Sequence, residues 1–261
     1  MNKKRNSPLK YILLIIISLV VIGLTQFLLQ NRTNGKIISG GETRRYLLYI
    51  PESYDPSTSS PLVISLHGFT QWPAHQKDMT GWNTLAEQHG FPVVYPKGTG
   101  FPLRWNVRAQ DEGKDTGAQD LLFLQDLIDH LMQSYNINSS RIYANGMSNG
   151  GGMSELLACE LSDQIAAIGG VSGAYLQSDE SCQPDRTVPV IAFHGQDDQI
   201  VPYDGGPSRD EQFNFLPVED WAEDWAGRNG CSSSPDKLQI TTEITRTSYK
   251  DCDKKSEVIL Y

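Results

Sequence analysis

The chain of 261 residues lacks several patterns that mark common classes of function. Positive charge is not in excess, because 22 lysines and arginines stand against 31 aspartates and glutamates, and the net charge of −9 argues against a nucleic-acid partner. No Cys-x-x-Cys spacing and no histidine–carboxylate spacing suggests a metal site. No glycine-rich loop carries the lysine of a phosphate-binding loop. We therefore expect no metal, no dinucleotide and no other cofactor.

Only one long apolar run is present, and it lies near the N-terminus. Lys3, Lys4, Arg5 and Lys10 precede a run from Tyr11 to Leu29, which as a helix would reach about 28 Å, close to the hydrocarbon thickness of a bilayer. The basic flank predicts that the rest of the chain lies outside the cytoplasm. An uncleaved signal anchor is favoured over a cleaved signal peptide, because no small-residue cleavage site follows the run. Residues 1–35 are thus predicted to be anchor and tether, and residues 36–261 one domain.

The remainder alternates between short apolar segments and helical patterns. Strands are predicted at residues 43–50, 62–66, 91–95, 142–145, 168–172, 188–193, 241–249 and 258–261, and helices at residues 120–135, 152–161 and 218–228. This alternation predicts an α/β fold with a mostly parallel sheet and helices on both faces. Residues 30–41 are interpreted as a tether. Residues 71–81 and 99–117 are interpreted as long loops that line a site.

The four cysteines permit three disulfide connectivities. Pairing sequence neighbours would close loops of about twenty residues, each stabilising by about 3 kcal/mol in the chain-entropy picture. Four buried free thiols are the alternative, which an oxidising compartment disfavours. The cysteines are Cys159, Cys182, Cys231 and Cys252.

The most informative stretch places Ser148 between Gly146 and Gly150, in a Gly-x-Ser-x-Gly frame that joins a predicted strand to a predicted helix. This is the sequence form of a nucleophile elbow, a tight turn that lifts a serine hydroxyl above the edge of a sheet. The glycines are needed because such a turn leaves no room for Cβ atoms. The alternative is a glycine-rich helix N-terminus that happens to hold a serine.

Acyl transfer by a serine also needs oxyanion donors and a carboxylate that orients the base. The amide of Asn149 is one candidate donor, and the amide of Phe69, in the turn after residues 62–66, is the other. Asp198 is the candidate carboxylate, because it follows the strand 188–193 and fits the chain order Ser, Asp, His. A solvated pair of aspartates, Asp197 and Asp198, in a turn is the alternative.

An ordered set of motifs carries a family resemblance. They are Leu66-His67-Gly68, Trp105-Asn106, Gly146 to Gly151, Ala158-Cys159-Glu160, His194-Gly195 with Asp198 to Tyr203, and Asn229-Gly230-Cys231. Over most of residues 43–261 the sequence resembles the exported polyhydroxybutyrate depolymerase and feruloyl esterase group of α/β-hydrolases, related to carbohydrate esterase family 1.

The resemblance implies an α/β-hydrolase fold and hydrolysis of carboxylic esters, such as acetyl or feruloyl groups on polysaccharide or short hydroxyalkanoate oligomers. It also supports disulfides within the 159–182 and 231–252 pairs. Trp105 would lie near the acyl pocket as a substrate-binding residue, with an ordinary core tryptophan as an equally good interpretation.

The expected base departs from the family pattern. All histidines, namely His67, His75, His89, His130 and His194, precede Asp198. In the family the base follows the last strand in a glycine-rich loop, and here the last residues are the predicted strand 258–261. His67 and His194 are predicted to be structural, His89 and His130 to lie at the surface, and His75 to be a remote candidate for a substitute base.

Two explanations follow from the missing histidine. Either the sequence is a truncated form of a longer esterase whose last strand and helix are incomplete, or the protein has lost its base. In both cases the 261 residues are predicted to be inactive or nearly so. The competing functions are a membrane-tethered module that binds polysaccharide or polyester without cleaving it, and a serine peptidase of the same fold.

Overall fold

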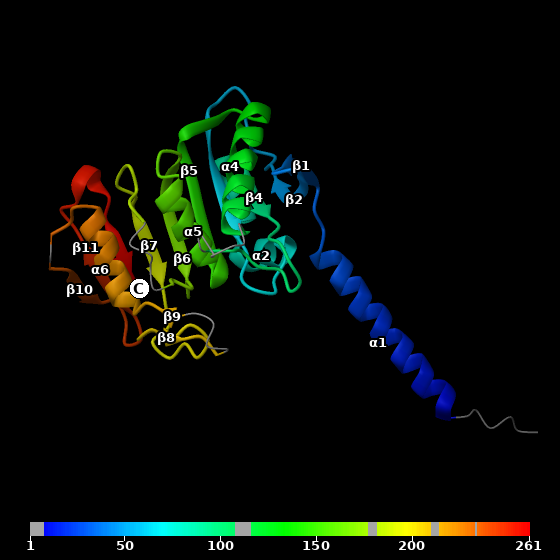
Figure 1. Ribbon diagram of the computed structural model, residues 1–261. Helices are drawn as coiled ribbons and strands as arrows, with labels where there is room; N and C mark the ends of the chain where they lie inside the picture. Colours follow the sequence, from blue (N-terminus) through cyan, green and yellow to red (C-terminus); the bar gives the residue numbers. More distant parts are fainter. Residues whose placement is uncertain (1–7, 108–115, 177–181, 210–213, 233) are drawn as a thin grey trace, which may run out of the picture.

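The computed structural model describes residues 8–107, 116–176, 182–209, 214–232 and 234–261. Within these residues the chain forms a ten-stranded mixed sheet (Figure 1). The strands in spatial order are β1 (Gly35–Ser39), β2 (Glu42–Tyr49), β4 (Val93–Pro96), β3 (Ser60–Leu66), β5 (Ile137–Met147), β6 (Ile165–Val171), β7 (Val190–Phe193), β12 (Val258–Leu260), β11 (Thr245–Tyr249) and β10 (Asp236–Gln239). The central strands from β4 to β12 run parallel to one another, as the sequence predicts.

Helices pack on both faces of this sheet. On one face lie α4 (Thr116–Ser134), α5 (Asn149–Glu160) and α6 (Val218–Arg228), whose apolar side chains form the main core with alternate residues of the strands. On the other face α2 (Pro73–Thr80) and α3 (Trp82–His89) lie near β3 and β4. Gln76 of α2 hydrogen-bonds Ser65 of β3, and Ala86 of α3 belongs to the smaller cluster that contains Val63. The predicted arrangement of layers is therefore confirmed.

Only one face of β7 is buried. Val190 and Ala192 are buried against the main core, whereas Ile191 and Phe193 are 38% and 44% exposed. The alternation arises because α2 and α3 cover only the β3–β4 side of that face in the part of the chain described. Phe193 stacks on Tyr261, the residue after β12, with ring centroids 5.0 Å apart.

Two predicted loops contain regular structure. The tether at residues 30–41 includes β1, which pairs antiparallel with β2. The loop at residues 71–81 is mostly α2, which has proline in its first turn and ends at Gly81 with a left-handed φ of 67°. The residues of α2 are mostly polar, so the sequence shows no apolar periodicity that would predict a helix. The loop at residues 99–117 has residues 108–115 outside the described residues, and α4 begins at Thr116.

The N-terminal apolar run forms α1 (Pro8–Gln30), which projects away from the sheet in Figure 1. From Lys10 to Leu29 this helix is long and apolar enough to cross a membrane, a property that signal sequences share. Its C-terminal end meets the domain where Phe27 contacts Trp72 edge to face at 5.9 Å between ring centroids. The predicted basic flank of Lys3, Lys4 and Arg5 lies outside the described residues.

Two disulfides close local loops at the α5–α6 side. Cys159 is bonded to Cys182, and Cys231 to Cys252, which is the neighbour pairing that the resemblance supports. The first bond ties the end of α5 to the segment before β7, and the second ties the segment after α6 to the segment before β12.

We predict that replacing both Cys159 and Cys182 by alanine lowers the free energy of unfolding by about 3 kcal/mol, because a cross-link over 23 positions restricts the unfolded chain. Urea unfolding followed by tryptophan fluorescence measures this difference. A double variant as stable as the parent under oxidising conditions would show that the bond contributes nothing to the fold.

The carboxyl group of Glu155, a residue of α5, lies among aromatic side chains. Glu155 accepts a hydrogen bond from the Trp221 indole at 2.5 Å, and Trp221 stacks on Tyr175 with centroids 3.6 Å apart. Burial raises the pKa of Glu155 from 4.5 to about 7, although the indole hydrogen bonds and Arg228 lower it. The fold therefore favours the protonated carboxyl group.

A pKa that is raised in the folded state predicts a stability that falls with pH. The contribution of Glu155 is fully present below pH 4.5, and it is lost as pH rises through about 7. We predict that Glu155→Gln flattens the stability profile across this window. Urea unfolding at half-unit intervals of pH measures the profile, and an identical slope in parent and variant would contradict the assignment.

Candidate active site

Ser148 lies at the turn between β5 and α5, with φ 52° and ψ −121°. A non-glycine residue at positive φ is strained, and this strain is typical of a nucleophile elbow. Neighbouring backbone leaves no space for side chains at the flanking glycines. A Cβ on Gly146 would lie 2.2 Å from the Gly150 carbonyl group, and a Cβ on Gly150 would lie 2.3 Å from the Leu66 carbonyl oxygen. The glycines of the Gly-x-Ser-x-Gly pattern are therefore needed for the predicted reason, because the turn leaves no room for their Cβ atoms.

The two predicted oxyanion amides lie on the neighbouring segments that follow β3 and β5. These strands pair in parallel up to Leu66 and Gly146, so Phe69 and Asn149 leave the same edge of the sheet. In the part of the chain that the structure describes, neither the Phe69 nor the Asn149 amide donates a hydrogen bond to another protein group. The Gly68 amide, by contrast, donates to Gln71 Oε1 at 3.0 Å. Both predicted donors thus remain available to a ligand oxygen.

Asp198 is held by main-chain donors in the turn after β7. Its Oδ1 accepts hydrogen bonds from the amides of Ile200 at 2.8 Å and Val201 at 3.0 Å. Burial raises its pKa, but the hydrogen bonds from these amides and from the Ser172 hydroxyl outweigh burial, and the pKa lies below its ordinary value. Asp198 is therefore a fixed carboxylate at neutral pH, and it is not simply one of a pair of solvated aspartates.

Ser172 connects the surroundings of Ser148 and Asp198, and sequence analysis missed it. The Ser148 amide donates to the carbonyl oxygen of Val171 at 2.9 Å, and the next residue, Ser172, hydrogen-bonds Asp198 through its side chain. Since β6 is the only strand between β5 and β7, the two turns are separated by two strand spacings, about 10 Å. Ser148 and Asp198 thus lie at the same edge of the sheet.

The histidines near this edge serve the fold. His194 donates from Nε2 to the Val201 carbonyl oxygen at 2.8 Å, and that oxygen can only accept, so Nε2 carries the proton. His67 is fully buried, and burial lowers its pKa to about 4. Its Nε2 accepts a hydrogen bond from the Gly98 amide at 3.0 Å. His67 is therefore a neutral structural group, and His194 is held by the loop that carries Asp198.

The remaining histidines lie on helices. His75 lies on α2 and His89 ends α3. His130, which was predicted at the surface, is half-buried on α4 with Nε2 3.1 Å from the Tyr46 hydroxyl, so that prediction is wrong. In the part of the chain described, which includes all five histidines, none hydrogen-bonds to Ser148.

Trp105 lies behind the turn that carries Phe69. Its side chain is 2% exposed and its indole nitrogen donates to the His67 carbonyl oxygen at 2.9 Å. This is the environment of a core tryptophan, the second of the two interpretations of Trp105. Phe69, in contrast, is 51% exposed at the same turn and is free to contact a ligand.

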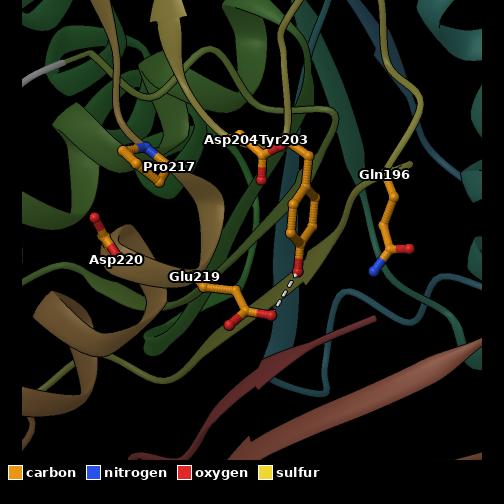
Figure 2. Close-up of a pocket in the computed structure, with 6 residues that line it drawn as sticks. All are labelled: Gln196, Tyr203, Asp204, Pro217, Glu219 and Asp220. Carbon is orange, nitrogen blue, oxygen red and sulfur yellow. Dashed lines mark hydrogen bonds between the residues drawn. The ribbon is translucent and has the colours of Figure 1, made fainter.

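A cavity of about 510 Å³ adjoins the loop that carries Asp198. Figure 2 shows its walls, which are Gln196, Tyr203, Asp204, Pro217, Glu219 and Asp220. The Tyr203 hydroxyl donates to Glu219 at 3.2 Å, and Lys237 pairs with the same carboxylate at 3.0 Å. These acceptor-rich walls suit hydroxyl groups and disfavour an anion. Among the residues described, no group of three or more histidine, cysteine, aspartate or glutamate side chains is placed to hold a metal ion.

Solved structures support the fold. An acetyl xylan esterase from Aspergillus awamori superposes with a TM-score of 0.64 over 87% of this chain and 91% of its own, at 17% sequence identity. A thermostable esterase superposes with a TM-score of 0.55 over 68% of this chain and 50% of its own, at 24% identity. The predicted α/β-hydrolase fold is therefore confirmed.

Sequence relatives are similar over most of this chain. A bifunctional acetylxylan esterase/xylanase from Neocallimastix patriciarum is 30% identical over 80% of the chain, and feruloyl esterase B from Piromyces equi is 29% identical over 80%. The matched part spans only 26% and 39% of the length of these two relatives. The family described as Esterase PHB depolymerase matches residues 44–201. Because that match covers more than half of the 261 positions, the chain belongs to the Esterase PHB depolymerase family.

Proposed function

We propose that this chain carries the nucleophile, the oxyanion site and the orienting carboxylate of a serine carboxylic-ester hydrolase. Ser148 is the nucleophile, the amides of Phe69 and Asn149 bind the oxyanion, and Asp198 orients the base. The observation that carries the proposal is the strained Ser148 turn on the same edge as an ionised, hydrogen-bonded Asp198, with Ser172 between them. Attack by Ser148 on the ester carbonyl would give an acyl-serine and release the alcohol, and water would then release the acid.

The base is the one group of this mechanism that the 261 residues do not supply at the expected place. No histidine follows His194 in the sequence. Oδ1 of Asp198 accepts hydrogen bonds from two amides, and His194 Nε2 lies 3.8 Å from Oδ2. We infer that the Asp198 carboxylate would accept the N–H of an imidazole base.

The substrate and location follow from the relatives and from α1. The names of the two relatives refer to acetylxylan and feruloyl esters, and the hydroxyl-compatible cavity beside Asp198 supports an alcohol rich in hydroxyl groups, such as a polysaccharide. The helix from Lys10 to Leu29 and the two disulfides support export, either as a secreted domain or anchored to the membrane.

A binding module without hydrolysis is the second candidate, and the lack of a histidine after Asp198 is the observation in its favour. Such a module would use the same cavity and the exposed Phe69 side chain to hold polysaccharide. It would need neither the strained turn at Ser148 nor the ionised Asp198, and for this reason we rank it below the hydrolase.

External imidazole tests the hydrolase directly. We predict that the 261-residue chain hydrolyses 4-nitrophenyl acetate near the background rate, because loss of the base from a triad costs about 10⁶ in turnover. Added imidazole should raise the rate at least tenfold above its reaction with the ester in buffer. The increase should follow the neutral form of imidazole, which predominates above about pH 7.

The Ser148→Ala variant shows whether the rescue depends on the Ser148 hydroxyl group. Ser148→Ala should abolish the imidazole-dependent increase while leaving the background reaction unchanged. An equal increase in the parent and in Ser148→Ala would remove the hydrolase proposal and favour the binding module.

The role of Asp198 is tested with its exposed neighbour as a matched control. Asp198→Asn should lower the imidazole-rescued rate at least tenfold, because the amide neither neutralises nor correctly orients the imidazolium ion. Asp197→Asn, which changes the same charge one position earlier, should leave it within twofold of the parent. Equal rates for the two variants would exclude Asp198 as the orienting carboxylate.

A further inference from the structure

The two predicted oxyanion amides lie on segments that the sheet no longer joins. The β3–β5 ladder ends at Leu66 and Gly146, before Phe69 and Asn149 are reached. An oxyanion site works only when its donors stay about 2.7–3.1 Å from the oxyanion, and displacement of a group by about 1 Å can cost 10²-fold in rate. Contacts outside the ladder must therefore fix the distance between these amides, and the close approach of Gly150 to Leu66 is one of them.

Residues 103–106, which we call the bridge segment, contact both of the segments that carry the amides. On the β3 side, the Leu103 carbonyl oxygen accepts the Thr70 amide at 2.8 Å and the Trp105 indole donates to the His67 carbonyl oxygen at 2.9 Å. The two contacts are made by His67, which precedes Phe69 in the sequence, and by Thr70, which follows it.

On the α5 side the contact is made by the side chain of Asn149 itself. Its Oδ1 accepts the Trp105 amide at 2.7 Å, and its Nδ2 donates to the Trp105 carbonyl oxygen at 2.9 Å. The side-chain amide therefore pairs with the main chain of Trp105 as a neighbouring strand would. The residue whose backbone N–H faces the predicted oxyanion is thus fixed by its own side chain.

A buried ion pair anchors the far end of the bridge segment. Asp120 of α4 is fully buried, and its Oδ2 accepts both the amide and the Nδ2 group of Asn106 at 2.9 Å. Its Oδ1 accepts from Arg44 of β2 at 2.6 Å, and the Arg44 guanidinium lies 4.1 Å from the ring centroid of Phe123. Every oxygen of Asp120 has a partner, so the charge is compensated in place.

We propose that the bridge segment and the Asn149 side chain are positioning elements that set the spacing of the Phe69 and Asn149 amides. Asn149 therefore acts twice, with its backbone N–H toward the oxyanion and its side chain toward Trp105. Arg44 and Asp120 act through Asn106 and do not touch the substrate. This inference rests on the proposed hydrolase function, since it concerns the same oxyanion site.

The test compares two asparagines with similar hydrogen bonding. Asn149→Ala removes both bonds to Trp105, leaves the backbone amide in place and strands no buried charge. Asn145→Ala is the matched control, because Asn145 is also partly buried on β5 and bonds Ser65, Trp82 and the Ile64 carbonyl oxygen away from the bridge segment. For each variant the imidazole-rescued kcat and KM, the melting temperature and hydrogen exchange at the Trp105 amide are measured on the full chain.

Asn149→Ala should lower the rescued kcat 10- to 100-fold with KM within twofold, and should speed exchange at the Trp105 amide at least tenfold. Asn145→Ala should lower the melting temperature without either effect. Unchanged exchange at Trp105 in Asn149→Ala, or equal losses of kcat in the two variants, overturns the proposal. If the parent shows no Ser148-dependent rescue, the proposed function fails, and the exchange measurement alone then decides whether Asn149 holds the bridge segment.

Discussion

The close approach of three backbone segments at Ser148 is the constraint on which the rest of the site depends. The turn after β5, the turn after β3 and the start of α5 meet where a single Cβ atom on Gly146 or Gly150 would overlap main-chain atoms. This contact holds Ser148 at positive φ and brings the Phe69 and Asn149 amides to one edge. The strain is local, and the packing of α5 on the sheet keeps it in place.

The polar groups around this edge are organised mainly by the main chain. Asp198 is fixed by two amides, His67 by the Gly98 amide, and Trp105 by a carbonyl oxygen on one side and an asparagine on the other. Hydrogen bonds of this kind lower the pKa of Asp198 despite its burial.

The sequence predicted the fold where a strong local signal existed. The helix at residues 218–228 was predicted at its observed bounds, and the strands near Leu62 and Ile142 were placed on the correct elements, because apolar periodicity marks buried elements. It missed α2 and β1, whose residues are mostly polar and whose structure depends on tertiary pairing. Ser172 and the Asn149 side chain were missed for a related reason. Their roles arise from contacts across segments, and a single polar residue in a turn gives no sign of them. The sequence did indicate a role for Asp120, because a carboxylate at the start of a strongly apolar helix face needs a charged partner such as Arg44.

Mass spectrometry of the acylated protein tests directly whether Ser148 is the nucleophile. The chain is mixed with 4-nitrophenyl acetate and imidazole, and the position of the acetyl group is determined in proteolytic peptides. We predict acetyl on Ser148 in protein that is quenched during the reaction, before water releases the acyl group. Acetyl on Ser172 or on lysines, with Ser148 unmodified, would contradict it.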